Sequence, residues 1–272
     1  MRSPTKQAGL SLLELMVAMI VGLFIIVGIS SVYLGNKRSN ITTNELSQLQ
    51  DNGRAILEQL TETIQHTGYS STSAAPSNEV FITSAVANAS CSDGSDSVLN
   101  TGIFSTMANN TAYGDTVGVI YLGDNQLNAD CGAAELPASC RMGSGATSAA
   151  ARIYNYFYVA PGATGVPELL CSGSRNTAAQ TIAQGVENLQ LTYGEDSNAD
   201  GTPDRYVNSA NVTNWGNVVS VHIAVLVRSL RPIAVANEAR SYRLSDDAII
   251  STNDRYLRAV FTTTIRLRNV TL

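Results

Sequence analysis

The hydrophobic pattern divides the first 66 residues into two stretches of different periodicity. Residues 10–34, "LSLLELMVAMIVGLFIIVGISSVYL", are apolar almost without interruption. At 1.5 Å per residue this stretch is ~37 Å long as a helix, enough to cross a hydrocarbon core of ~30 Å. From Leu46 to Ile64, apolar or small residues recur with a 3.6-residue period, which predicts a helix that packs one stripe against a folded domain. No proline interrupts residues 10–66 and Gly68 can end a helix, so we predict one long helix over 10–66.

Beyond this helix the pattern changes to period two, as expected for β-strands. Strands are predicted near residues 115–123, 151–160, 189–193, 217–229 and 255–269. One face of the fourth carries Val219, Val221, Ile223, Val225 and Val227, and one face of the fifth carries Leu257, Ala259, Phe261, Thr263, Ile265 and Leu267. Such alternation indicates half-buried antiparallel strands. The predicted fold is α+β: the long helix packs on an antiparallel β-sheet head domain formed by residues 67–272.

Two charged features bear on the apolar run. Arg2 and Lys6 precede it, and a positive flank stays on the cytoplasmic side, so the head is expected on the opposite side of a single span. The run is longer than the core of a secretory signal and no small-x-small site follows it, so the segment is expected to remain in the protein. Glu14 lies near the start of the apolar run. A carboxylate at the centre of a membrane helix costs roughly 2.5–3.5 kcal/mol, and an acidic residue within such a helix normally has a partner.

Charge and cysteine content narrow the function classes further. The chain has 17 basic and 22 acidic residues, a net charge of −5 without a basic tract, which argues against nucleic acid as a partner. Its four cysteines form no C-x-x-C pair and lie near no histidine cluster, so disulfides outside the cytoplasm are favoured over zinc or free thiols. Three connectivities are possible. The favoured one pairs Cys131 with Cys140 and Cys91 with Cys171.

The segment "DSNADGTPD" is the sharpest local motif of the head. Five of its residues match ligand positions of an EF-hand-like calcium loop: Asp196, Asn198, Asp200, Thr202 and Asp204. Val207 replaces the bidentate glutamate of such loops, although Glu195 could supply a ligand, and no helices are predicted on either side. The alternative is a metal-free turn, since Asp, Asn and Gly also form turns. Calcium is therefore the one candidate cofactor.

Catalytic motifs are missing from the sequence. The two histidines, His66 and His222, fall at a helix end and within a strand, and no G-x-S-x-G, H-E-x-x-H or P-loop spacing occurs. We therefore expect a protein that is not an enzyme.

The residues around Glu14 resemble a known signal. A basic leader, Gly9, and then Leu10-Ser11-Leu12-Leu13-Glu14 are similar to the class III signal of type IV prepilins. The resemblance implies that prepilin peptidase removes residues 1–9 by cleavage between Gly9 and Leu10. It also implies N-methylation of Leu10, where the family usually has Phe, and an assembly role for Glu14, which meets the N-terminal amine of an adjacent subunit. Because Glu14 lies about one turn from Leu10, it could also compensate the amine of its own subunit. Loss of Arg2 and Lys6 would leave a net charge of 15 − 22 = −7.

The late segments narrow the family. "GVENLQLTYGEDSNADGTPDRYV", "VVSVHIAVLVRS" and "DRYLRAVFTTTIRLRN" resemble the C-terminal half of PilW-type minor pilins. The resemblance implies a minor pilin in the bacterial inner membrane with a periplasmic head, present on the pilus and cell surface after assembly. Implied partners are other minor pilins, the major pilin, a tip adhesin, and inner-membrane lipid before assembly, with a role in pilus initiation or at the tip. Two alternatives stay open: a J-type pseudopilin of type II secretion, and a membrane-anchored periplasmic binding or adhesion protein that never polymerises.

Overall fold

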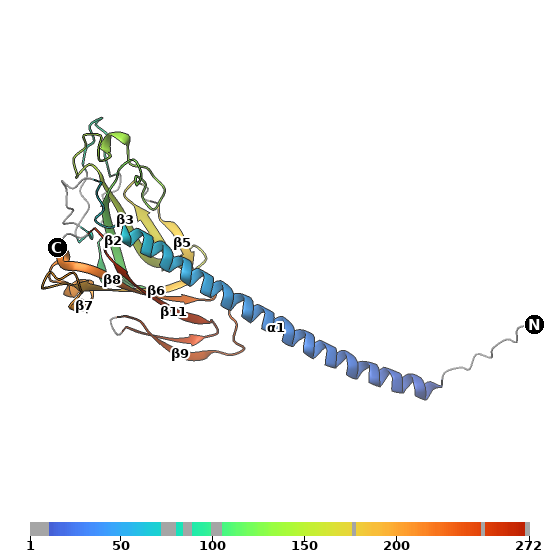
Figure 1. The fold of residues 1–272 in the computed structure, drawn as a ribbon. Helices are drawn as coiled ribbons and strands as arrows, with labels where there is room; N and C mark the ends of the chain where they lie inside the picture. The colour runs from blue at the N-terminus through green and yellow to red at the C-terminus, as the bar shows by residue number, and fades with distance from the viewer. Residues whose placement is uncertain are drawn as a thin grey trace, which may run out of the picture. The chain divides into compact units, whose positions relative to one another are not determined.

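The computed structural model describes residues 11–71, 80–83, 89–98, 105–175, 178–245 and 248–269. Its longest element is α1 (Leu12–Gln65), a helix of 54 residues that confirms the predicted long helix (Figure 1). The helix ends as expected at Gly68, whose φ of 72° is a left-handed conformation that glycine adopts without steric cost. The Asn269 amide caps this end, because its Nδ2 donates to the Gln65 carbonyl at 3.1 Å.

The chain forms two compact units, residues 1–46 and residues 47–272. The boundary lies within α1, so the second half of the helix belongs to the same unit as the strands. The predicted division into a leader, a helix and a head over residues 67–272 stays a prediction.

The strands of the second unit form one nine-stranded sheet and a separate two-stranded sheet (Figure 1). The large sheet has the order β11-β8-β6-β2-β3-β4-β5, with β1 beside β2 and β7 beside β6. Its strands are β1 (Met107–Thr111), β2 (Gly114–Leu122), β3 (Arg152–Pro161), β4 (Pro167–Gly173), β5 (Gln180–Gln184), β6 (Val186–Glu195), β7 (Arg205–Val207), β8 (Val218–Arg228) and β11 (Arg258–Arg266). The small sheet is the hairpin β9 (Glu238–Arg243) and β10 (Ile249–Asp254). Short 3-10 helices, at Ala138–Cys140, Ser209–Asn211 and Trp215–Asn217, lie in the connections.

The large sheet is antiparallel except where β2 meets β6. These two strands pair in parallel at a single position, Gly114 with Leu189. Gly114 has a φ of 103°, and a side chain there would collide with the Leu189 carbonyl oxygen. Glycine therefore permits the close crossing that joins the two halves of the sheet.

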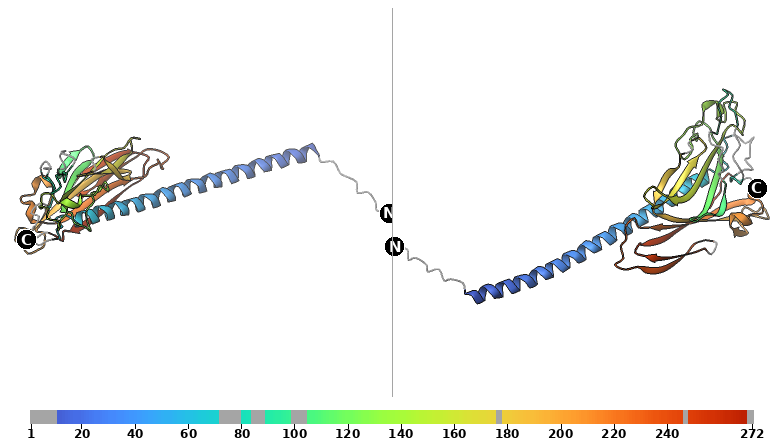
Figure 2. Two further views of the ribbon diagram at one scale, coloured as in Figure 1. Left: turned by 90° about the horizontal axis from the view of Figure 1, so that it is seen from above. Right: turned by 180° about the vertical axis from the view of Figure 1, so that it is seen from behind.

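The main core lies between the second half of α1 and the sheet, and Figure 2 shows this part of the helix running along the strands. The helix contributes Leu49, Ile56, Leu60 and Ile64, each no more than 2% exposed. The inward face of β8 contributes Val221, Ile223, Val225 and Val227, and that of β11 contributes Ile265, followed by Leu267. The amphipathic stripe and the two inward faces predicted from the sequence are thus confirmed.

The expectation that β8 is half-buried is wrong. Its other face is buried too, because Ala224 and Leu226 pack under Leu244, Tyr242 and Ile250 of the segment that forms the β9–β10 hairpin. This hairpin is inserted between β8 and β11 in sequence and covers the outer face of the sheet formed by the same two strands.

The favoured disulfide pairing is also wrong. The structure pairs Cys91 with Cys140 and Cys131 with Cys171, at Cα–Cα distances of 4.9 and 6.3 Å. Cys131 lies within a tight turn in which Gly132 N and Ala134 N donate to Asp130 Oδ1, and it packs against the core that includes Cys171 of β4. Cys140 instead ends a short 3-10 helix and packs in the same small core as Cys91. The two cysteines at the ends of this short loop, Cys131 and Cys140, therefore belong to different disulfides.

Candidate functional site

The first turn of α1 contains a reciprocal pair of hydrogen bonds. The Ser11 backbone N–H donates to Glu14 Oε2 at 3.0 Å, and the Glu14 backbone N–H donates to Ser11 Oγ at 3.2 Å. This is a capping box, in which the residue before the helix and the third helical residue satisfy each other's free backbone donors. The Glu14 carboxylate thus has a partner within its own chain. Gly9 and Leu10 lie outside the described residues.

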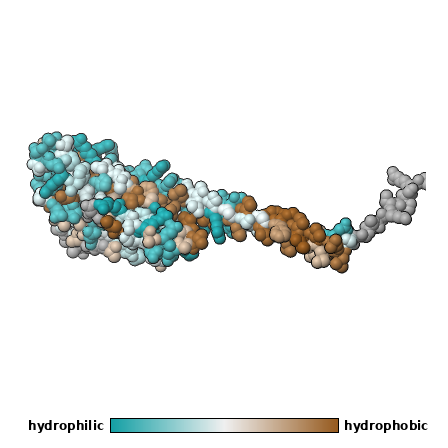
Figure 3. All heavy atoms as spheres, turned by 90° about the horizontal axis from the view of Figure 1, so that it is seen from below, coloured by the Kyte–Doolittle hydropathy of each residue, from teal (hydrophilic) through white to brown (hydrophobic). Residues whose placement is uncertain are grey.

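The helix that follows this cap is apolar on all sides up to Leu34. Its large hydrophobic side chains from Leu12 to Leu34 are between 51% and 78% exposed, and Figure 3 shows them as a brown surface along this part of the helix. Among the described residues, α1 is one helix long and apolar enough to cross a membrane. So large an apolar surface requires a lipid environment or other helices around it.

The candidate calcium residues meet in one turn after β6. The Asp196 carboxylate is 1% exposed and accepts the backbone N–H groups of Ala199 and Gly201 at 2.7 and 2.6 Å. Asp200 accepts from Thr202 N at 2.8 Å, and Asp204 accepts from Ser197 N at 2.8 Å.

The fifth candidate, Asn198, donates from Nδ2 to Asp200 Oδ2 at 3.1 Å, so all five side chains belong to one hydrogen-bonded turn. Within the part of the chain that the structure describes, no three His, Cys, Asp or Glu side chains converge as a metal site. The carboxylates of the turn accept hydrogen bonds from backbone N–H groups of the turn itself, and calcium binding stays a prediction.

Glu195 fixes the base of this turn. Its Oε1 accepts from Thr213 N at 2.8 Å and Asn214 N at 3.1 Å, while Arg205 donates to Oε2 from Nε and Nη2 at 2.9 and 2.7 Å. Burial opposes ionisation of Glu195, but the hydrogen bonds from Asn214, Thr213 and Arg205 outweigh it and lower its pKa to about 2. The ionised carboxylate of Glu195 thus has a structural role, because both of its oxygens accept hydrogen bonds from within the head.

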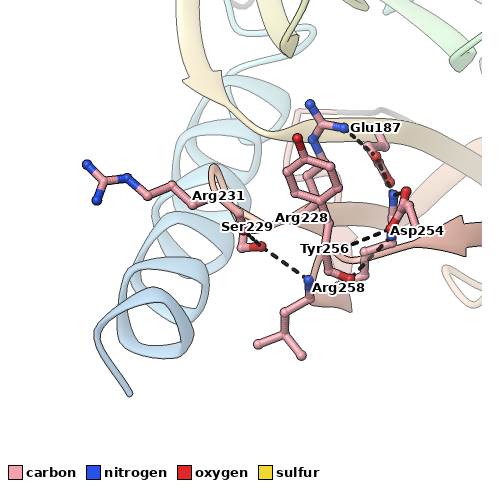
Figure 4. Close-up of polar contacts among 8 residues, drawn as sticks. Glu187, Arg228, Ser229, Arg231, Asp254, Tyr256 and Arg258 are labelled. Carbon is pink, nitrogen blue, oxygen red and sulfur yellow. Dashed lines mark hydrogen bonds and ion pairs between the residues drawn. The ribbon is translucent and has the colours of Figure 1, made fainter. Parts of the chain in front are cut away.

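A second ionic cluster joins the ends of four strands (Figure 4). Arg258 at the start of β11 donates to Glu187 of β6 at 2.5 and 2.9 Å and to Asp254 of β10 at 2.6 and 2.7 Å. Glu187 also pairs with Arg228 of β8 at 3.3 Å, and the Arg228 guanidinium lies 4.3 Å from the Tyr256 ring centroid.

The cluster compensates an unfavourable strand pairing. Arg258 and Arg228 are directly opposite each other in the β8–β11 ladder, where like charges repel. Glu187 and Asp254 supply two negative charges for these two positive ones. Hydrogen bonds from Arg258 lower the pKa of Asp254 to about 2, so this carboxylate stays ionised above that pH.

The same end of the sheet fixes the segment that follows β8. Ser229 N donates to the Leu257 carbonyl at 2.8 Å, and Leu257 N donates to Ser229 Oγ at 3.1 Å. Ser229 Oγ in turn donates to the Arg231 carbonyl at 2.8 Å (Figure 4). Leu230 is therefore held between two anchored neighbours.

Comparisons with known proteins agree with this arrangement at both ends of the chain. Residues 4–30 match the model of the prokaryotic N-terminal methylation motif, and residues 156–269 match the model of type IV pilus-assembly protein W. The two matches identify the chain as a PilW-type minor pilin of the type IV pilus. Its role is that of a minor pilin in type IV pilus assembly, anchored in a membrane through α1 and interacting with other pilins in the pilus.

A type IV-like pilin from Thermus thermophilus is similar in structure to this chain. It has a TM-score of 0.40 and 13% sequence identity over 85% of this chain and 98% of the other. Among curated proteins, none matches the chain.

Two features of this minor pilin could have been expected from the sequence but were not. The Ser11–Glu14 cap has a recognisable signal, since S-x-x-E before an apolar run is the spacing of a capping box. The cluster around Arg258 has a weaker one: an arginine at the start of a strand, four residues after Asp254. Glu187 could not be added from sequence, because its place beside Arg258 depends on the pairing of β6 with β8.

Proposed function

We propose that prepilin peptidase cleaves the chain between Gly9 and Leu10, that Leu10 is then N-methylated, and that α1 holds the protein in the bacterial inner membrane with its head in the periplasm. The observation that carries this proposal is the methylation motif over residues 4–30, which runs directly into the exposed apolar half of α1. On assembly, the same apolar surface transfers from lipid into the core of the fibre, where it packs against other pilin helices.

We further infer that the protein acts in pilus initiation or at the pilus tip, with other minor pilins, the major pilin and a tip adhesin, and that it does so without catalysis. The match of residues 156–269 to type IV pilus-assembly protein W supports this role. The ionised groups of the head support it as well, because Glu195, Asp254 and Arg258 are committed to internal hydrogen bonds. Deletion of the gene is expected to abolish pili and to leave type II secretion intact. Loss of secretion with normal pili would contradict the assignment.

Intact mass and N-terminal mapping test the processing step. The protein is isolated from membranes and from sheared pili, and both samples are expected to begin at a methylated Leu10. An uncleaved N-terminus at Met1, found in membranes and missing from sheared pili, would overturn the proposal.

Substitutions in the capping box separate its two roles. Glu14→Gln keeps an acceptor for the Ser11 N–H but removes the charge that an N-terminal amine would need, whereas Ser11→Ala removes only the hydroxyl side of the cap. If assembly depends on the charge, Glu14→Gln and Glu14→Ala both reduce incorporation into sheared pili at least tenfold, and Ser11→Ala has a smaller effect. Wild-type incorporation of Glu14→Gln would assign the residue to capping alone.

A further inference from the structure

A groove runs between the head portion of α1 and the edge strand β5. It has a volume of about 520 Å³, and all of its lining side chains are uncharged. Asn52, Ala55 and Gln59 of α1 line one side and Ile182 of β5 lines the other, and Leu230 also lines the groove. Leu230 is 39% exposed and is one of few large apolar side chains exposed on the head. Its position is fixed by the neighbouring Ser229 contacts described above.

The β5 wall offers a free backbone edge. In the described part of the sheet, β5 pairs with β4 and with no strand on its other side. Gly185 N donates to the Pro167 carbonyl at 2.8 Å, and adjacent residues of antiparallel strands alternate in direction. The N–H and C=O of Gln184 therefore point away from β4. Such an edge is a template for the backbone of another strand.

The sequence of β5 does not protect this edge. Exposed edges are commonly blunted with charged residues or proline, and β9, β10 and β11 each carry Arg, Asp or Glu. The strand β5, "QTIAQ", has neither a charge nor a proline. A bulge opposite Leu169 and Leu170 leaves Ile182 as the extra residue, and bulges redirect side chains in this way. Ile182 lines the groove as a result.

We propose that this groove binds an extended, uncharged segment of another minor pilin, which adds a strand to β5 and places apolar side chains against Ile182 and Leu230. The proposal rests on the proposed role in assembly and specifies where a partner docks. Free backbone groups select an extended chain, and an uncharged lining selects a segment without charges, since a buried unpaired charge would be costly.

The test uses full-length mature protein in detergent micelles, with each of the other minor pilins of the same pilus, purified in the same way, as the probe. Thr181→Lys adds the kind of charge that blunts an edge, and Thr181→Val is its control, because it also removes the hydroxyl that donates to Glu168 at 2.9 Å but adds no charge. Asn253→Lys adds the same charge on exposed strand β10. Thr181→Lys is expected to weaken binding of one minor pilin at least tenfold, and Asn253→Lys less than twofold. Leu230→Ala should weaken the same complex, while Val235→Ala, at an 81% exposed position of the same connection, should not.

Hydrogen exchange gives an independent measurement, because the outward amide of Gln184 should become protected in the complex. Equal affinities of wild type and Thr181→Lys, binding only to a second copy of this chain, or no binding by any minor pilin would each overturn the docking site. The proposed function is judged separately, by loss of pili on gene deletion. Abolished pili with an unaltered Thr181→Lys complex would reject the groove and keep the function.

Discussion

The two halves of α1 share one helical backbone but present opposite surfaces. From Leu12 to Leu34 the large apolar side chains are at least 51% exposed, whereas Leu49, Ile56, Leu60 and Ile64 are at most 2% exposed. Helix geometry is the same in both, so the difference comes from the distribution of apolar residues around the axis. The first half is apolar on every side; the second has a single apolar stripe.

The contrast shows what each half requires of its surroundings. A single stripe is satisfied by one partner, and the sheet of the head supplies it. A helix that is apolar all round needs apolar surroundings on every side, which lipid or a bundle of other helices can provide. The first half of the helix can therefore be surrounded by lipid or by other pilin helices, whereas the second half keeps its contact with the sheet of the head.

The largest predicted effect separates the halves by their contribution to folding. Leu60→Ala should lower the free energy of unfolding of the head by about 2–5 kcal/mol, because it leaves a cavity in the main core. Ile25→Ala, at a 56% exposed position of the first half, should change it by less than about 0.5 kcal/mol.

Urea unfolding of the full chain in detergent micelles measures both variants. Trp215 is the single tryptophan of the chain and packs 4.9 Å from the Tyr193 ring centroid, so its fluorescence reports on the core of the head. Equal destabilisation by the two substitutions would show that the first half also supports the fold of the head.

A smaller destabilisation is expected for a glycine substitution in the second half of the helix than for Leu60→Ala. A side chain at Gly53 would collide with the Phe261 ring, whereas Gly28 has nothing within 4 Å. Gly53→Ala should therefore destabilise the head by about 1–2 kcal/mol, since overpacking outweighs the gain of ~1 kcal/mol in helix propensity. Gly28→Ala should leave head stability unchanged and raise helix content by circular dichroism. A stabilising Gly53→Ala would mean that the Phe261 ring moves aside.

The elements with long, regular patterns could be predicted from the sequence. The helix, the inward faces of β8 and β11, and the stop at Gly68 all follow from local periodicity or backbone preference. The burial of β8 on both faces could not be predicted. It depends on the β9–β10 hairpin, whose charged and polar residues give no sign that Tyr242 and Ile250 cover Ala224 and Leu226.

The disulfide pairing and the ionic cluster could not be predicted from the sequence for a related reason. The preference for joining Cys131 to Cys140 weighted closeness in sequence, but the turn that contains Cys131 packs against the core near β4, so Cys171 is its neighbour in space. Glu187 and Arg258 are 71 residues apart in the chain and meet only because β6 and β11 both pair with β8. Contacts set by sheet order require the assembled sheet, whereas the cap at Ser11 and Glu14 can be recognised from four consecutive residues.

The last predicted effect concerns pH and should affect the head alone. Glu195 has a pKa of about 2 in the folded state and about 4.5 when exposed, so the folded protein stabilises its ionised form. This contribution is complete above pH ~4.5 and is lost as the pH falls towards ~2, because the unfolded chain binds the proton first. Glu195→Gln should therefore reduce the slope of unfolding free energy against pH in this window, by at most about 1.4 kcal/mol per pH unit. Trp215 fluorescence in urea at a series of pH values measures the slope, and lower stability with an unchanged slope would show that the charge of Glu195 contributes nothing.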